Sequence, residues 1–521
     1  MKSTTDLYDL ICSLSKSERR YISLSILEKG EKAYLKLFQA MEKQKSFNEK
    51  ELEILLKKEG ISYRLSELKH YLHNYILKKL NNFYYGSSVE STLHQSLLET
   101  DILIKKNLYS QAQKKLFRIK KLAEKDEALT LLLQCITREK ELFIHTNYKG
   151  VSQYDLDQLL KRQMSLTKMI DDENGYRALL DEQNILSRKA GFFRNESQHN
   201  KIKRLLRHPL LKNGGSPLSF NSKRYFYAIR AGCYIFFGDY KNALKNIEPI
   251  LSLLEPRIYA HEHLLRAYVI WLSNKAHSQG MRRDYVNALL TIGKMRNIIK
   301  NMKKEGKSNQ VMIQYIVNKS YDREIALYMD SGQFAKALDT IPVIEQVIKK
   351  YADSMPERFL LVFYYNFSCT QFIFGNYKQA LFYLRKILNR KRKDIAMRED
   401  IYGYFKILYL LTCYEVQKEN LSEYLIKSTY DFIAQDKHLY KTEIIFLSFF
   451  RYKLLKNHDP DELTLLLGEL KEKMLRNKEK NRQPNTQESF DFISWIESKI
   501  SGRTFLEVLN EKHDSVLLLK G

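Results

Sequence analysis

Apolar residues recur along this chain at the spacing of a helix face. The first such set, at positions i, i+3, i+4 and i+7, is Leu7, Leu10, Ile11 and Leu14. Ser15 and Glu18 then have the spacing of a capping box, which begins a second helix. Gly30 interrupts a stripe of apolar residues that continues beyond it. We predict a four-helix N-terminal domain over residues 1–86, which ends where Gly86 and two serines mark a boundary.

The helical pattern continues through the rest of the chain, and no segment shows the alternation and turns of a strand-rich fold. We predict a degenerate helical-repeat region at 87–212 and helical repeats at 218–475. Asn-Gly-Gly-Ser-Pro at 213–217 is a linker between them. Residues 476–521 are predicted to form a mobile loop and C-terminal capping helices. The expected fold class is therefore all-α.

Shorter features refine this division. Loops are predicted near 147–150 and 171–175, where Asn, Asp and Gly gather. The polar run at 476–488 contains a proline and gives the predicted mobile loop. The apolar residues of the first capping helix are Phe490, Ile493, Trp495 and Ile496.

One eight-residue pattern occurs three times in the 218–475 segment. It reads Phe-Gly-Asp-Tyr-Lys-Asn-Ala-Leu at 237–244, Ser-Gly-Gln-Phe-Ala-Lys-Ala-Leu at 331–338 and Phe-Gly-Asn-Tyr-Lys-Gln-Ala-Leu at 374–381. Glycine permits a left-handed turn, the aromatic ring fills the space between two helices, and alanine lets the second helix approach the first. Weaker copies centre on Tyr285, with Ala276 and Ala288, on Tyr109, with Ala112, and near Leu421.

This pattern resembles the turn between the two helices of a tetratricopeptide repeat, in which the family shows Gly-x-Tyr-x-x-Ala-Leu. The family's core positions on the second helix fall on Ile247 and Ile250, Ile341 and Ile344, and Leu384 and Ile387. The resemblance implies a right-handed α-solenoid of antiparallel helix pairs. The aromatic positions are 43 to 49 residues apart, against about 34 in the family. That difference implies longer helices or longer connections.

The composition agrees with long helices, but it does not decide whether the positive charge binds an anionic partner. The 521 residues include 8 Pro and 19 Gly, where average usage gives roughly 25 and 35. The net charge of +26 favours anionic partners. However, the Lys and Arg residues are interleaved with Asp and Glu, which is typical of solvated helix faces.

The cysteines and apolar runs indicate the compartment. The five cysteines are scattered without a CxxC pair, as in free thiols of a reducing compartment. No continuous apolar stretch at the N-terminus forms a signal peptide. The longest apolar stretches, such as 444–450, are far shorter than the roughly 20 residues of a membrane span. We expect a cytoplasmic protein without a membrane partner.

No motif identifies a reaction. The sequence lacks a phosphate-binding Gly-rich loop, a GxGxxG fingerprint, GxSxG and HExxH. His261 and His263 flank a glutamate, but no spacing supplies the further ligands that a metal needs. We therefore expect no metal, no cofactor and no enzymatic activity.

Candidate partner contacts follow from the repeat register. Positions expected to face a groove are Tyr225, Lys319, Asp322 and Tyr365. Ordinary packing is the competing explanation for them. The family's carboxylate-clamp asparagine falls on Gly232, Ala326 and Cys369, so the resemblance does not extend to that clamp.

The densest basic cluster has two interpretations: it contacts a polyanion, or it is a solvated helix C-terminus. It consists of Arg390, Lys391, Arg392 and Lys393.

Two functions remain in competition. The first is a protein- or peptide-binding α-solenoid, an interaction scaffold or regulator. The alternative is a nucleic-acid-associated regulator, in which the helix-turn-helix-like outline of 51–80 contacts DNA and the repeats sense a ligand. The 1–86 segment carries 16 Lys and Arg against 11 Asp and Glu, which is no enrichment over the whole chain. This balance favours the first function.

Overall fold

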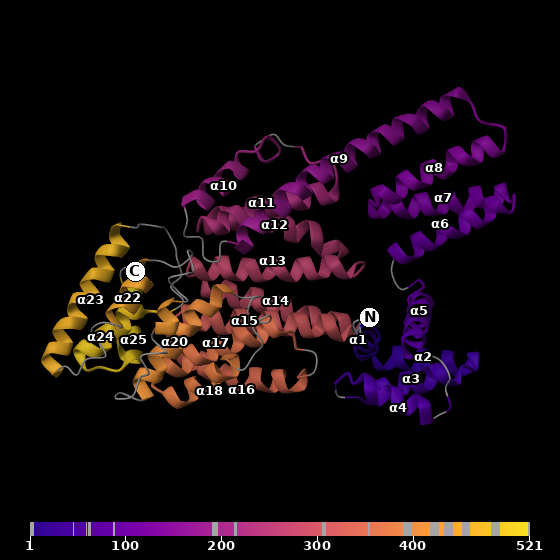
Figure 1. Ribbon diagram of the computed structural model, residues 1–521. Coiled ribbons are helices and arrows are strands. Elements are labelled where there is room, and N and C mark those ends of the chain that lie inside the picture. Colours follow the sequence, from indigo (N-terminus) through magenta and orange to yellow (C-terminus); the bar gives the residue numbers. More distant parts are fainter. Residues whose placement is uncertain are drawn as a thin grey trace. The chain divides into compact units, whose positions relative to one another are not determined.

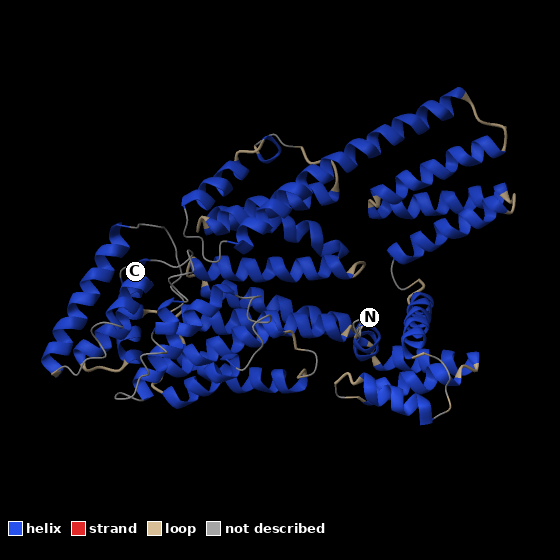
Figure 2. Ribbon diagram, in the orientation of Figure 1, coloured by secondary structure: helices blue, strands red, loops and turns tan. Residues whose placement is uncertain are grey.

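The computed structural model describes residues 5–44, 46–58, 60, 64–86, 89–189, 196–212, 216–304, 309–352, 355–388, 399–416, 427–431, 441–450, 459–480 and 490–518. Helices joined by turns make up these residues, and no strand occurs among them, which confirms the all-α prediction (Figure 2). The chain divides into two compact units, unit 1 (Met1–Thr167) and unit 2 (Lys168–Gly521). Across the described parts of the chain, no helix is both long and apolar enough to span a membrane.

Figure 1 labels the helices in chain order. The helices that begin in unit 1 are α1 (Asp6–Ser13), α2 (Lys16–Lys29), α3 (Lys32–Lys43), α4 (Glu49–Lys58), α5 (Leu65–Phe83), α6 (Val89–Lys105), α7 (Tyr109–Asp126), α8 (Leu129–His145) and α9 (Gln153–Lys189). Those of unit 2 are α10 (Glu196–Leu206), α11 (Phe220–Phe236), α12 (Tyr240–Leu254), α13 (Glu262–Met281), α14 (Tyr285–Lys304), α15 (Gln310–Asp330), α16 (Phe334–Lys350), α17 (Glu357–Ile373), α18 (Tyr377–Leu388), α20 (Glu399–Val416), α22 (Lys441–Phe449), α23 (Pro460–Lys480), α24 (Phe492–Ser501) and α25 (Phe505–Leu518).

The first 86 residues contain five described helices, so the prediction of four is wrong. Ser15 and Glu18 form the predicted capping box at the start of α2. Gly30 ends α2 in the left-handed conformation, with φ of 75°. A new helix, α3, then begins at Lys32 instead of continuing α2. The five helices share one apolar core, in which Leu37, Phe38 and Leu72 are fully buried.

In the next segment, α6, α7 and α8 pack one against the next (Figure 1). The predicted loop near 147–150 is confirmed, with positive φ at Asn147, Tyr148 and Gly150. The predicted loop at 171–175 is wrong, because α9 runs through it as one helix. Gly175 has a packing reason instead: a Cβ there would stand 3.2 Å from Leu210 Cδ1.

Unit 2 is a sequential array of packed helix pairs. Each helix from α11 to α18 packs against the next, and α18 packs against α20. The first helices of the pairs also contact one another, α13 with α15, α15 with α17, and α17 with α20. Among the described second helices, α14, α16 and α18 make no mutual contact of comparable extent. The first helices therefore lie on the more tightly packed side of the array.

The turns within the pairs agree with the residue types in the sequence pattern. Gly238, Gly332 and Gly375 have φ of 70°, 72° and 73°, a left-handed conformation that glycine adopts without steric cost. The aromatic residue two positions later begins the second helix in every case. The alanines Ala243, Ala337 and Ala380 have no exposed surface, and the predicted isoleucine and leucine core positions are buried.

The weaker copies on Tyr285 and Tyr109 have the same turn geometry. Their alanines, Ala276, Ala288 and Ala112, are also fully buried. The left-handed turn position is occupied by Arg283, with φ of 63°, and by Asn107, with φ of 61°. The copy near Leu421 lies outside the described residues.

The C-terminal helices close unit 2. The predicted loop at 476–488 is wrong at its start, because α23 extends to Lys480; residues 481–489 lie outside the described part. The apolar residues predicted for the first capping helix are buried. Glu415 fixes α24 to α20, because it accepts hydrogen bonds from Trp495 Nε1 at 2.8 Å and Lys499 Nζ at 2.7 Å.

The buried alanines give a direct test of the helix contacts. We expect Ala337→Trp to destabilise unit 2 by roughly 1–3 kcal/mol, because the added volume cannot fit between two touching helices. Ala335 lies on the same helix but is exposed, so Ala335→Trp should unfold like the parent. Urea unfolding followed by circular dichroism measures both. Equal unfolding of the two variants would contradict the helix contact at Ala337. Ala243→Trp and Ala380→Trp should behave like Ala337→Trp.

Candidate functional site

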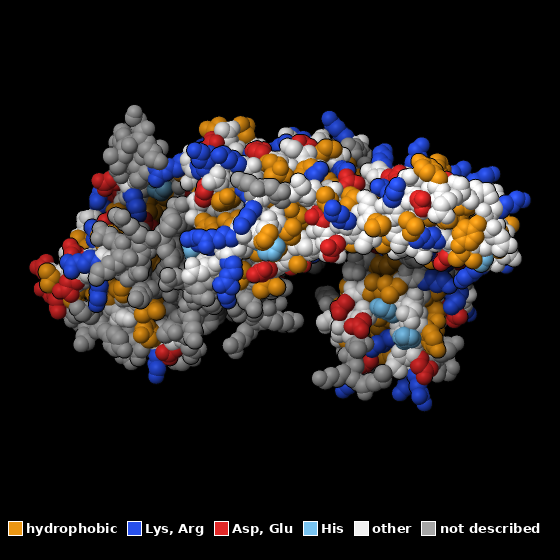
Figure 3. All heavy atoms as spheres, turned by 90° about the horizontal axis from the view of Figure 1, so that it is seen from above, with side chains coloured by type: hydrophobic (Ala, Val, Ile, Leu, Met, Phe, Trp, Pro, Cys, Tyr) orange, Lys and Arg blue, Asp and Glu red, His pale blue; other side chains and the backbone are white. Residues whose placement is uncertain are grey.

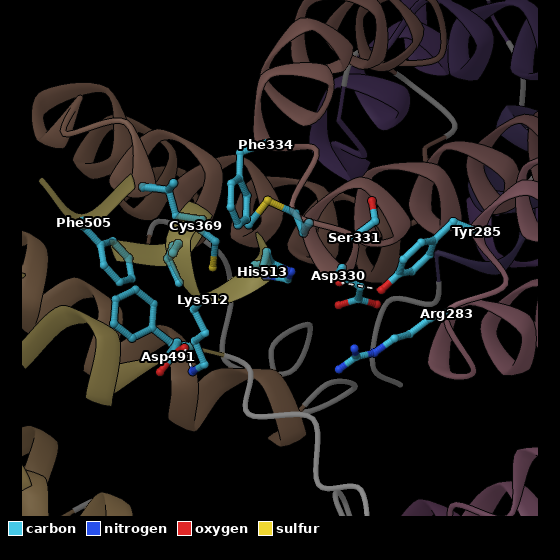
Figure 4. Close-up of a pocket in the computed structure, with 14 residues that line it drawn as sticks. Arg283, Tyr285, Asp330, Ser331, Phe334, Cys369, Asp491, Phe505, Lys512 and His513 are labelled. Atoms are coloured by element: carbon cyan, nitrogen blue, oxygen red, sulfur yellow. Dashed lines mark hydrogen bonds and ion pairs between the residues drawn. The ribbon is translucent and has the colours of Figure 1, made fainter. Parts of the chain in front are cut away.

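A cavity of about 370 Å³ lies in unit 2, at the edge where turns of the array meet the C-terminal helices (Figure 4). We call it the turn-edge cavity. Its lining residues are Arg283 and Tyr285 from the α13–α14 turn, Met329, Asp330, Ser331 and Phe334 from the α15–α16 turn, Cys369 and Ile373 from α17, and Phe490, Asp491, Phe505, Leu509, Lys512 and His513 from the C-terminal segment.

Aromatic contacts hold the C-terminal segment against the array. Phe372 of α17 packs edge-on against Phe490 and Phe505, with ring centroids 5.2 and 5.9 Å apart. The imidazole of His513 packs against Phe334 at 5.6 Å. This approach requires glycine at position 332, because a Cβ there would stand 2.9 Å from His513 Cγ.

Phe505 lines one end of the cavity beside the Asp491–Lys512 pair, and Arg283 and Asp330 line the other end. In Figure 4, Phe505 and Cys369 lie on one side, Arg283, Asp330, Ser331 and Tyr285 on the other, and His513 between them. Tyr285 Oη donates to the backbone oxygen of Asp330 at 3.3 Å and so joins the two turns.

The remaining charges of the cavity are internally balanced. Asp491 caps α24, since it accepts hydrogen bonds from Ser494 N at 3.1 Å and Ser494 Oγ at 2.7 Å, and it also pairs with Lys512. Burial alone would raise the pKa of Asp491, but Lys512 and Ser494 outweigh it and the pKa is lowered. Burial lowers the pKa of His513, and Lys512 adds to this effect, so the imidazole is neutral at neutral pH.

A second concave surface, of about 810 Å³, belongs to unit 1. It runs between α7 and the first part of α9, with α8 as its floor, and we call it the α7–α9 groove. On α7 its lining residues recur at helical spacing: Ser110, Gln113, Phe117, Lys120 and Glu124. Two ion pairs lie along it: Lys120 Nζ of α7 pairs with Glu139 Oε2 of α8 at 2.6 Å, and Arg162 Nη2 of α9 pairs with Glu124 Oε1 of α7 at 3.4 Å.

Unit 1 also exposes many large apolar side chains. More than half of the exposed large apolar residues in the described chain belong to this smaller unit. Those with more than half of their surface exposed on α6 to α9 include Leu98, Ile102, Phe117, Ile144, Tyr154 and Met164. Single exposed apolar residues are ordinary on a protein surface, whereas a contiguous group of them marks an interaction site.

The structure separates the predicted groove residues. Tyr225 on α11 and Tyr365 on α17 are buried. The Tyr225 ring lies beside the guanidinium groups of Arg177 and Arg224, at 5.8 and 4.8 Å. Lys319 and Asp322 share one face of α15 and are partly exposed. A partner contact through any of the four residues stays a prediction.

The predicted basic cluster, Arg390, Lys391, Arg392 and Lys393, lies outside the described residues. On the face that Figure 3 shows, the described Lys and Arg side chains are interspersed with Asp, Glu and apolar side chains.

The helix-turn-helix-like segment corresponds to α4 and α5, and part of its turn lies outside the described residues. Within α5, Lys69 is buried, and its Nζ pairs with Glu49 Oε1 of α4 at 2.8 Å. This lysine therefore stabilises the helix pair and is not available to a phosphate.

The described His, Cys, Asp and Glu side chains were compared with the requirements of a metal site and of a cysteine nucleophile. Among the described residues, no group of three or more His, Cys, Asp or Glu side chains could hold a metal ion. Burial raises the pKa of the Cys135 thiol to about 11 and those of Cys233 and Cys369 to about 12. These three thiols are therefore protonated at neutral pH.

No protein-family model matches the chain, and no curated protein matches it.

Sequence reasoning identified neither concave surface. The turn-edge cavity combines residues more than 200 positions apart, and periodicity does not show which turn a C-terminal helix covers. One local signal was present: Arg283 stands where the three strongest copies have glycine.

Gly332 tests whether α25 lies on the turn. Gly332→Ala and Gly375→Ala both place alanine at positive φ, at a cost of roughly 1–2 kcal/mol each. Gly332→Ala should cost more, because its Cβ also meets His513, whereas the Cβ at 375 meets nothing within 4 Å. Adding His513→Ala should recover the difference in unfolding free energy. Equal costs for the two glycine variants would contradict the contact.

Proposed function

We propose that this chain is a non-enzymatic helical-repeat protein that binds a partner protein or peptide through unit 1. We also propose that its helix pairs are divergent tetratricopeptide-like repeats that form a right-handed α-solenoid. The left-handed turn residues and the fully buried alanines support that relationship. The main support for binding through unit 1 is the large number of exposed apolar side chains in this unit.

The α7–α9 groove is the proposed contact site. Exposed apolar surface next to a groove is typical of protein interaction sites. Three helix faces line the groove, and its apolar lining includes Leu116 of α7 and Leu142 of α8, with charged residues such as Lys120 and Arg162 beside them. An amphipathic helix or extended peptide suits such a surface, with its apolar side chains on the floor and its polar ones toward the rims. Phe117, with 68% of its surface exposed, is the proposed central contact.

The protonation states support a role without catalysis. A cysteine nucleophile needs a lowered pKa, whereas those of Cys135, Cys233 and Cys369 are raised. A general base needs a pKa near the working pH. Burial, with Arg323 alongside, lowers the pKa of His277 to about 3.

The nucleic-acid alternative has weaker support. Its proposed reading helix, α5, exposes Lys78 but also Glu67, and Lys69 is paired with Glu49. Contacts to phosphate would need an excess of free cations on this helix. The binding experiment below therefore includes a result that would favour this alternative.

The experiment compares two exposed apolar positions. Phe117→Glu changes the groove, and Val286→Glu changes an equally exposed position on α14, where 72% of the side chain is accessible. Both variants should fold like the parent. Proteins crosslinked to the chain in native lysate would be identified with and without nuclease, and the purified partner would then be titrated by calorimetry. We expect Phe117→Glu to weaken binding at least tenfold, about 1.4 kcal/mol, because an aromatic contact is lost. Val286→Glu should bind as the parent does.

Two results would contradict the proposal. Equal partner affinity of the two variants would exclude the groove as the contact site. Loss of the complexes after nuclease treatment would favour the nucleic-acid alternative instead.

A further inference from the structure

We propose that the outer face of α10 and the turn after it contact the phosphate backbone of duplex DNA, without selection of base sequence. We call this face the α10 basic surface, and its members are Lys201, Lys203, Arg204, Arg207 and Lys212. The surface belongs to unit 2. Neither the α7–α9 groove nor the helix-turn-helix-like segment takes part in it.

The segment that contains α10 departs from the interleaving of opposite charges in the rest of the sequence. Residues 197–238 contain eight Lys and Arg but no Asp or Glu, although the whole chain has 61 Asp and Glu among 521 residues. A segment of this length would ordinarily contain several acidic residues. The positive charge is therefore not balanced locally along the chain.

The cations lie on the side of α10 that faces solvent. Ile202 and Leu205 are buried on the opposite side, in a core shared with residues of α9 and α11. Helical periodicity then places Lys203, Arg204 and Arg207 together on the outer face, at positions i, i+1 and i+4. All five members of the α10 basic surface are exposed.

The five side chains have no partner within the described structure. Among the described residues, no carboxylate pairs with any of them, and none of their side chains donates a hydrogen bond or lies against an aromatic ring. Two carboxylates of α9 are engaged elsewhere. Asp181 pairs with Arg177, and Glu173 accepts a hydrogen bond from Asn221 Nδ2 at 3.0 Å. Glu182 is exposed on α9 but pairs with none of the five cations.

Contacts with neighbouring helices hold the surface in place. α10 packs against α11 (Figure 1). In the turn after α10 (Pro209–Leu211), the backbone oxygen of Leu210 accepts a hydrogen bond from Tyr176 Oη of α9 at 3.0 Å. The backbone oxygen of Leu211 accepts one from Arg230 Nη1 of α11 at 2.8 Å. A surface whose backbone is already fixed loses less conformational freedom on binding, which favours affinity.

The composition of the surface favours phosphate over a protein or a membrane. Protein interfaces are enriched in aromatic residues and depleted of lysine, whereas residues 199–212 contain three lysines and no Phe, Tyr or Trp. A helix that binds a membrane surface needs a free apolar face, and the apolar face of α10 is buried.

The same residues favour duplex DNA among the nucleic acids. Single strands are bound by stacking of bases on aromatic rings, which this surface lacks. Duplex RNA is recognised partly through its 2′-hydroxyl groups, and Asn200 is the only amide or hydroxyl side chain of residues 199–212. Contact with the phosphates of a DNA duplex requires cations alone.

Fluorescence anisotropy with the full chain and a labelled DNA duplex of mixed sequence tests the proposal. Each neutralised phosphate contributes about 0.9 to the slope of log affinity against log salt concentration. The combined variant Lys203→Gln, Arg204→Gln and Arg207→Gln should therefore lower the slope by roughly 2 to 3 and weaken binding at low salt at least tenfold. Its melting temperature should equal that of the parent, because none of the three side chains pairs with a carboxylate in the described structure.

The matched control is the combined variant Lys300→Gln, Lys303→Gln and Lys304→Gln. These residues are also exposed at the C-terminal end of a helix, α14, and carry the same total charge. This variant should keep the slope of the parent. Arg204→Lys with Arg207→Lys should keep it as well, because a phosphate contact requires a cation and not one particular side chain.

Three results would overturn the proposal: no DNA binding at about 50 mM salt, a parent-like slope in the α10 variant, or an equal loss in the α14 control. Poly-L-glutamate, duplex RNA or phosphatidylserine vesicles are the competitors. Any of them that displaces the DNA at an equal or lower concentration of negative charge would overturn the choice of DNA. Phe117→Glu should bind DNA like the parent, and the α10 variant should bind the unit 1 partner like the parent, so the two proposals fail separately.

Discussion

The close approach of the two helices within each pair is the constraint on which the array depends. It requires a left-handed residue in the turn, so that the chain reverses within a few residues, and a small residue where the helices touch. Gly238 and Ala243 satisfy both conditions in the first strong repeat, and Gly375 and Ala380 satisfy them in the last. A larger residue at the alanine position would separate the helices and expose the apolar surface that holds neighbouring pairs together.

The same constraint produces the turn-edge cavity. Turns built to one geometry lie along an edge of the array, and the C-terminal helices cover part of that edge. Glycine at 332 has two roles there, since it allows the left-handed turn and leaves room for His513. Arg283 and Asp330 of the cavity come from the turns, whereas Cys369 comes from α17 and Phe505, Asp491 and Lys512 come from the C-terminal segment.

Helix faces and turns were predictable from sequence because they depend on neighbours within about ten residues. The capping box at Ser15 and the buried Ala337 are such cases. A glycine by itself does not predict whether a helix ends. Gly30 ends α2, whereas Gly175 lies inside α9, where Leu210 packs closely against it. The cavity could not be predicted, since the contact of α25 with the α15–α16 turn depends on tertiary packing that periodicity does not encode.

Each unit contains a departure from the usual preferences of amino acids, in the exposure of apolar side chains in unit 1 and in the backbone conformation of one residue in unit 2. Unit 1 leaves Phe117 and other large apolar side chains exposed to solvent. Unit 2 has Arg283 at a left-handed turn position where its three strongest repeats have glycine. Departures from local preference are expected at functional or strained sites. Asn107 shows that a side chain can occupy this turn at little cost. Glu127 and Tyr148 of unit 1 also adopt positive φ, so Arg283 is one of several positions where the turns of this chain accept a side chain in the left-handed region.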